Sequence, residues 1–219
     1  MNIILLDNIA ILDTSDCKEL TDTCMRVSEF YESHKYKGNV QILKQDIINL
    51  YIEIGEGEEY YNVFEGYNFP KSTIEEFFTV NQPDEFEETL TNLPLPVTYV
   101  IGYITGDQQV LIHELAHAFY FSFNEYKQQA DAITNSLSPM VRNILIKWLT
   151  KSGYDQQVHQ DELQAYIVED LLGDLIEDDL ELHTVINNTC DQFNAFKQLF
   201  HKTLTAIKGQ EVLGLSLTV

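Results

Sequence analysis

The chain has 219 residues, of which 44% are hydrophobic, enough for one compact domain or two closely packed lobes. Its 35 acidic residues outnumber 13 basic ones and give a net charge of −22, which argues against nucleic acid and anionic membranes as partners because both bind basic surfaces. The N-terminal segment has no basic leader, no apolar run approaches about 18 residues, and the three cysteines are an odd number. We therefore expect a cytoplasmic protein with reduced cysteines, no signal peptide and no transmembrane helix.

Short strands and helices are predicted to alternate before residue 107. The sequence favours a strand over 2–12, followed by a helix that opens with a capping box of Asp16 and Glu19 and runs to about Ser33. The remaining predictions for this part, in chain order, are a helix within 40–54 after an extended start, a strand at 60–64, a turn at 66–70, a short helix capped by Ser72, one helical turn within 81–96, and a buried or half-buried strand at 97–104.

From residue 107 onward the pattern is mostly helical. The predicted helices span 108–123, 125–136, 138–151, 158–174 and 181–207, and a short extended tail follows them. The predicted fold class is therefore α+β. Residues 1–106 form a mixed N-terminal part with a small sheet, residues 107–219 form a helical part, and a cleft is expected between the two parts of one compact unit.

The most informative motif is 113–117 (HELAH), which matches H-E-x-x-H. Residues four apart lie on one face of a helix, so the imidazoles of His113 and His117 can both reach one ion. Glu114 points about 100° away and can act as a base without taking a coordination position. Asp107 is a suitable N-cap, and the apolar residues around the motif predict a buried helix, in which polar side chains must be paired or bind a ligand. The motif predicts a catalytic Zn²⁺ site.

A catalytic zinc ion needs a third protein ligand, and the predicted helix 158–174 offers candidates. Glu162 lies one turn before Tyr166, on the apolar side of this helix, and is the predicted third ligand. His159, three residues earlier, is the alternative. The neighbouring Asp161 is expected to point elsewhere, onto a solvated acidic face.

HELAH followed by DELQAY resembles the gluzincin group of zinc metallopeptidases, and the resemblance covers about residues 97–174. It implies a zincin-like fold in which 97–104 is an edge strand before the metal helix. It also implies roles for four residues: His113, His117 and Glu162 as zinc ligands and Glu114 as the general base. The acidic residue that orients a ligand histidine in that group is not plainly present, so Tyr166 or Glu169 would have to serve.

The expected activity is hydrolysis of a peptide or protein substrate. Glu114 would take a proton from a zinc-activated water and pass it to the leaving amine, and Tyr166, His159 or Tyr154 would stabilise the oxyanion. An extended peptide could bind by adding a strand to 97–104. Two alternatives stay open. One is a zinc-dependent regulator that cleaves or binds one partner protein, and the other is a catalytically inactive zincin-fold interaction protein.

Overall fold

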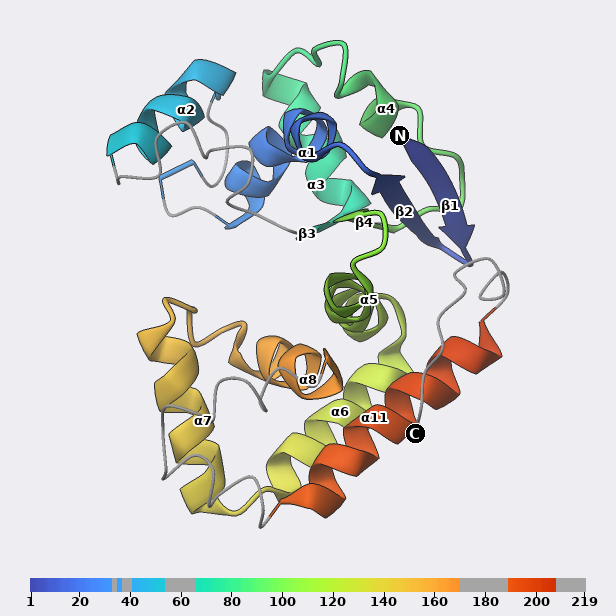
Figure 1. The fold of residues 1–219 in the computed structure, drawn as a ribbon, viewed down its shortest axis with the longest axis vertical. Coiled ribbons are helices and arrows are strands. Elements are labelled where there is room, and N and C mark those ends of the chain that lie inside the picture. Colours follow the sequence, from blue (N-terminus) through green and yellow to red (C-terminus); the bar gives the residue numbers. More distant parts are fainter. Residues whose placement is uncertain (33–34, 37–40, 54–65, 170–188, 208–219) are drawn as a thin grey trace. The chain divides into compact units, whose positions relative to one another are not determined.

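The computed structural model describes residues 1–32, 35–36, 41–53, 66–169 and 189–207. It confirms the α+β class, because helices are combined with a four-stranded mixed sheet (Figure 1). The relation to zincin folds stays a prediction. The chain divides into two compact units, Met1–Glu114 and Leu115–Val219, and the boundary falls inside helix α5 (Gln108–Ser122). In the described ranges, none of the helices combines the length and the apolar character needed to cross a membrane.

Some predicted elements lie outside the described residues. These are the strand at 60–64, the end of the helix at 158–174, the start of the helix at 181–207 and the extended tail.

The sheet belongs to the first unit and has the strand order β1-β2-β4-β3. Its strands are β1 (Asn2–Leu6), β2 (Ile9–Thr14), β3 (Gly66–Pro70) and β4 (Tyr99–Ile104). β2 and β4 pair in parallel, whereas β1 and β3 pair antiparallel to β2 and β4 respectively. The prediction that 97–104 is an edge strand was therefore wrong, because β4 has a partner on both sides. In the described part of the chain, β3 lies at that edge instead.

Two predictions near the sheet failed for local reasons. The expected single strand over 2–12 is a hairpin, in which Asp7 adopts a positive φ of 54° between β1 and β2. Asp tolerates this conformation better than most residues, and that was the available signal. The expected turn at 66–70 is strand β3, because pairing with β4 overrides the local preference of its Gly, Asn and Pro residues.

Four helices of the first unit are described: α1 (Cys17–Glu32), α2 (Lys44–Glu53), α3 (Lys71–Val80) and α4 (Glu88–Thr91). α1 and α3 pack on one face of the sheet (Figure 1). Asp16 caps α1 as predicted, since its Oδ1 accepts from the backbone N–H of Lys18 at 2.9 Å. Glu19 does not complete the capping box, because its carboxylate binds Thr14 and the N-terminal amine of Met1.

Both cysteines of the first unit lie on α1. Cys17 and Cys24 are free thiols. Cys24 lies fully buried on α1 against the sheet, and this burial holds the pKa of its thiol well above the usual value. Cys24 is therefore a packing residue rather than a reactive one.

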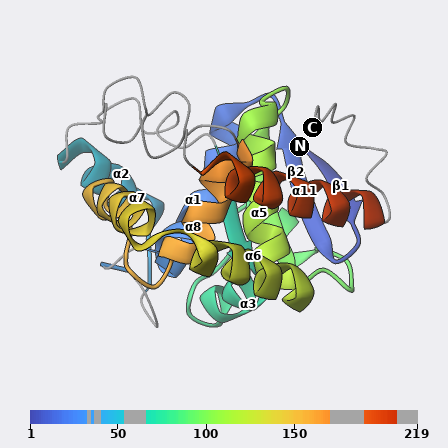
Figure 2. The same ribbon diagram turned by 90° about the horizontal axis from the view of Figure 1, so that it is seen from below.

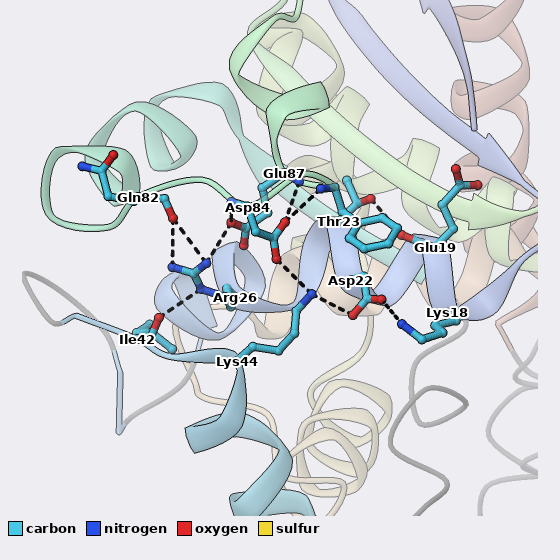
Figure 3. A network of polar contacts seen from close by, with 11 residues as sticks. Lys18, Glu19, Asp22, Thr23, Arg26, Ile42, Lys44, Gln82, Asp84 and Glu87 are labelled. Atoms are coloured by element: carbon cyan, nitrogen blue, oxygen red, sulfur yellow. Dashed lines mark hydrogen bonds and ion pairs between the residues drawn. The ribbon is translucent and has the colours of Figure 1, made fainter.

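A network of buried and partly buried ion pairs connects α1, α2 and the segment before α4 (Figure 3). Arg26 pairs with Glu87 at 2.9 Å, and Lys44 bridges Asp22 at 2.7 Å and Asp84 at 3.0 Å. Glu87 is 0% exposed, and among the described residues its Oε1 has no hydrogen-bond partner. Burial raises the pKa of Glu87 to about 7, although Arg26 opposes the shift.

The described residues of the second unit are mostly helical, as predicted. Besides the end of α5 it contains α6 (Asn124–Ser136), α7 (Pro139–Lys151), α8 (His159–Glu169) and α11 (Cys190–Ala206), seen from below in Figure 2. α11 packs against α6 and α8, and α8 also contacts α6 and α7. The ring of Phe119 on α5 joins these helices, because it contacts Tyr126 on α6 at 5.7 Å and Phe200 on α11 at 5.1 Å.

Candidate metal centre

Helix α5 carries the H-E-x-x-H motif, and its beginning is built as the sequence predicts. Gly106 has a positive φ of 95°, which closes the turn after β4. Asp107 caps the helix, since its Oδ1 accepts from the N–H of Val110 at 3.1 Å. Residues 114–120 are all buried, so the polar side chains among them need partners.

The three predicted metal ligands form one group. The ligand atoms of His113, His117 and Glu162 all lie within 4.8 Å of one another. His117 Nε2 is 3.8 Å from Glu162 Oε2, compared with about 3.4 Å between two ligand atoms of an ideal tetrahedral zinc ion. Two imidazoles and one carboxylate are a donor set that suits zinc. The residues present therefore fit a zinc ion.

His117 has a second acidic neighbour, which the sequence analysis placed wrongly. Its Nδ1 lies 2.9 Å from Asp161 Oδ1, so Asp161 does not belong to a solvated face. The two ring nitrogens of an imidazole point in different directions, and adjacent residues of α8 can therefore face one each. An Nδ1–H that donates to Asp161 fixes the tautomer in which Nε2 carries the free lone pair. Asp161, which directly precedes Glu162, is placed to orient the ring of His117, a role that was predicted for Tyr166 or Glu169.

Glu114 is held by residues of β3 and β4, within the first unit. It is 7% exposed, and its Oε2 accepts from Asn68 Nδ2 at 2.7 Å. Asn68 Oδ1 in turn accepts from the hydroxyl of Tyr99 at 2.6 Å, which fixes the orientation of the amide. Glu114 Oε1 lies so close to Gly66 that a Cβ at that position would be 2.3 Å away. Gly66 and Asn68 were not predicted as site residues, because the local sequence favours a turn at 66–70.

His159 and Tyr166, the predicted oxyanion donors, make contacts with α7 and with the loop before α8. His159 is buried, and its Nε2 is 2.9 Å from the carbonyl oxygen of Tyr154, to which an Nε2–H would donate. The hydroxyl of Tyr166 is 2.7 Å from that of Tyr154, and its ring packs edge-to-face on Trp148 at 5.0 Å. His159 is not part of the metal-binding group. A role for either residue in oxyanion stabilisation stays a prediction.

Comparisons of the chain with models of known protein families, with curated proteins and with solved structures each found no match.

Proposed function

We propose that this protein is a zinc-dependent metallopeptidase, with His113, His117 and Glu162 as ligands and Glu114 as general base. The observation that supports this most directly is the convergence of the three ligand side chains within 4.8 Å. Glu114 adjoins the ligand His113 and is buried, as a base beside a metal site would be, and a purely structural site has no use for such a base.

A zinc ion bound there would supply a water molecule of lowered pKa and a positive charge for the developing oxyanion. The protein side chains would do the rest. Asn68 fixes one carboxylate oxygen of Glu114, so the base is held in one orientation instead of sampling several. Glu114 would take the proton of the attacking water and deliver it to the leaving amine. Asp161 would hold the ring of His117 in place during the cycle.

The proposed docking strand for an extended substrate is β3 rather than β4. The backbone N–H of Lys71 donates to Thr98 at 2.9 Å, and hydrogen-bonded pairs alternate along an antiparallel ladder. In this register, the backbone N–H and C=O groups of Gly66 and Asn68 point away from β4, toward the edge of the sheet. Pro70, which has no N–H, belongs to the same outward set, as expected for an edge strand. A peptide paired there would lie beside the Asn68–Glu114 hydrogen bond.

The test compares the wild type with Glu114→Gln and with Glu125→Gln, an exposed carboxylate on α6. Zinc content and hydrolysis of an unstructured protein such as casein are measured for each. We expect all three proteins to bind one equivalent of zinc. Glu114→Gln should lose at least about 100-fold of the turnover, the usual contribution of general base catalysis, and Glu125→Gln should keep it.

Equal turnover by Glu114→Gln and the wild type would remove Glu114 from the mechanism. A wild type without stoichiometric metal would refute the proposal altogether. Zinc binding without cleavage of casein would instead favour the regulator of one partner protein.

A further inference from the structure

A chain of hydrogen bonds in the second unit ends on the metal ligand His117. Tyr126, on α6, donates through its hydroxyl to Gln164 Oε1 at 2.7 Å. Gln164, on α8, donates through Nε2 to Asp161 Oδ1 at 3.1 Å. The same Oδ1 lies 2.9 Å from His117 Nδ1 on α5. Three helices are thus connected through polar side chains to one nitrogen of the imidazole.

The polarity of this chain is fixed by chemistry. A carboxylate only accepts hydrogen bonds, so Gln164 must turn its amide nitrogen toward Asp161 and its oxygen toward Tyr126. Tyr126 must then donate, and it stays protonated because burial and the charge of Asp161 hold its pKa well above the usual value. Each donor points toward Asp161, which stabilises the negative charge that His117 faces.

The burial of these residues makes the arrangement costly to change. Gln164 is 0% exposed and Tyr126 is 2% exposed, so breaking either of their hydrogen bonds would leave a buried polar atom without a partner. The ring of Tyr126 also packs on Phe119, two residues after His117 on α5. The helix that carries the ligand is therefore held by the same tyrosine through its ring.

We propose that Gln164 and Tyr126 are positioning residues for the metal ligand His117, acting through Asp161. This inference rests on the proposed metal centre. Without Gln164, Asp161 would be free to rotate and the Nδ1–H of His117 would lose its fixed acceptor. The lone pair of Nε2 would then point toward Glu162 and His113 for only part of the time, and zinc affinity would fall.

The experiment measures zinc affinity by competition with a chromophoric chelator for the wild type and four variants. Asp161→Ala serves as the reference, with an expected loss of about 10- to 100-fold. Gln164→Leu should weaken zinc binding by roughly 3- to 10-fold, the effect of one hydrogen bond, and Tyr126→Phe by less than that. Tyr120→Phe is the matched control. It removes a buried hydroxyl that donates to Asp131, a residue that takes no part in the hydrogen bonds from Tyr126 to His117.

A second measurement separates positioning from mere packing. The Nδ1 proton of His117 is followed by NMR in metal-free and zinc-loaded protein, while thermal unfolding of each variant reports its stability. Gln164→Leu and Tyr126→Phe should shift or broaden this proton resonance, and Tyr120→Phe should leave it in place.

The inference would be overturned if Gln164→Leu and Tyr126→Phe both kept the zinc affinity and the His117 resonance of the wild type, even if both variants were less stable. If the wild type bound no zinc, the proposed function would fail. The metal-free resonance would still decide whether Gln164 and Tyr126 position His117.

Discussion

Two neighbouring atoms determine where the side chain of Glu114 lies: the amide nitrogen of Asn68 and the Cα of Gly66. Asn68 fixes one carboxylate oxygen by a hydrogen bond. The absence of a side chain at position 66 leaves room for the other oxygen. Gly66 is therefore required by close approach and not by backbone conformation.

Gly66→Ala should displace the base while the fold and the metal ligands remain. The new Cβ would meet Glu114 Oε1 at 2.3 Å and Val110 Cγ1 at 2.8 Å, so the carboxylate must move aside and Val110 must shift as well, at a cost in stability. We expect zinc binding close to that of the wild type and at least about 100-fold less peptide hydrolysis, since a misplaced base cannot reach its water.

Gly102→Ala is the control for this prediction. Its Cβ would meet Leu20 Cδ1 at 2.8 Å, on the face of the sheet that α1 covers. It should reduce the thermal stability but not the activity per folded molecule. If both alanine variants were equally active, close packing of Gly66 on Glu114 would have no catalytic role.

Single residues also show how far the sequence could predict the site. The spacing of His113, Glu114 and His117 was sufficient to predict that the two imidazoles lie side by side, because residues four apart share one face of a helix. Glu162 could be predicted to lie near them from the amphipathic pattern of a second helix. Asp161 was placed on the wrong face, because helix periodicity describes where a side chain starts and not how far its carboxylate can reach toward a ring nitrogen of another helix.

At the scale of elements, helices were easier to predict than strands. α5, α6 and α7 begin and end within about two residues of the expected positions, since caps such as Asp107 and Ser138 are local signals. β3 is a strand only because β4 lies beside it, and the letters GYNFP read alone favour a turn. The edge of the sheet, and with it the proposed docking strand, could therefore not be predicted from local patterns.

The proposed docking of substrate on β3 predicts a dependence on the substrate backbone. A peptide with one N-methylated amide at a position that pairs with β3 loses a donor and gains a bulky group, so its KM should rise by about 10-fold. The measurement compares singly N-methylated versions of one cleaved peptide. β3 spans five residues, so methylation well beyond that length should have little effect. A uniform response at all positions would argue against strand addition.

At the scale of the whole molecule, a metal bound by α5 and α8 should stabilise the folded chain. Zinc at about 100 times its dissociation constant would add about 2.7 kcal/mol to the free energy of unfolding. For a chain of this size, we expect the midpoint of thermal unfolding to rise by roughly 5–10 °C on adding zinc to chelator-treated protein. Glu162→Ala should lose this increment, and the exposed carboxylate variant Asp191→Ala should keep it. An equal rise in both variants would place the zinc elsewhere on the chain.

The ion-pair network of the first unit (Figure 3) leads to a prediction about pH that does not depend on metal. Burial raises the pKa of Glu87 to about 7 in the folded state, above the ordinary value of 4.5 that the unfolded chain should show. The folded protein therefore binds this proton more tightly. The stabilisation is complete below about pH 4.5 and is lost as the pH rises through about 7, with a size on the order of 3 kcal/mol.

Glu87→Gln tests this directly, because it keeps an acceptor for Arg26 but cannot titrate. Urea unfolding between pH 5 and 8 should show a free energy that falls with rising pH in the wild type and falls less steeply in Glu87→Gln. Glu85→Gln, an exposed neighbour, should retain the wild-type slope. If Glu87→Gln kept that slope as well, Glu87 would be charged in the folded protein throughout this range. The pair with Arg26 would then outweigh the cost of burying the carboxylate.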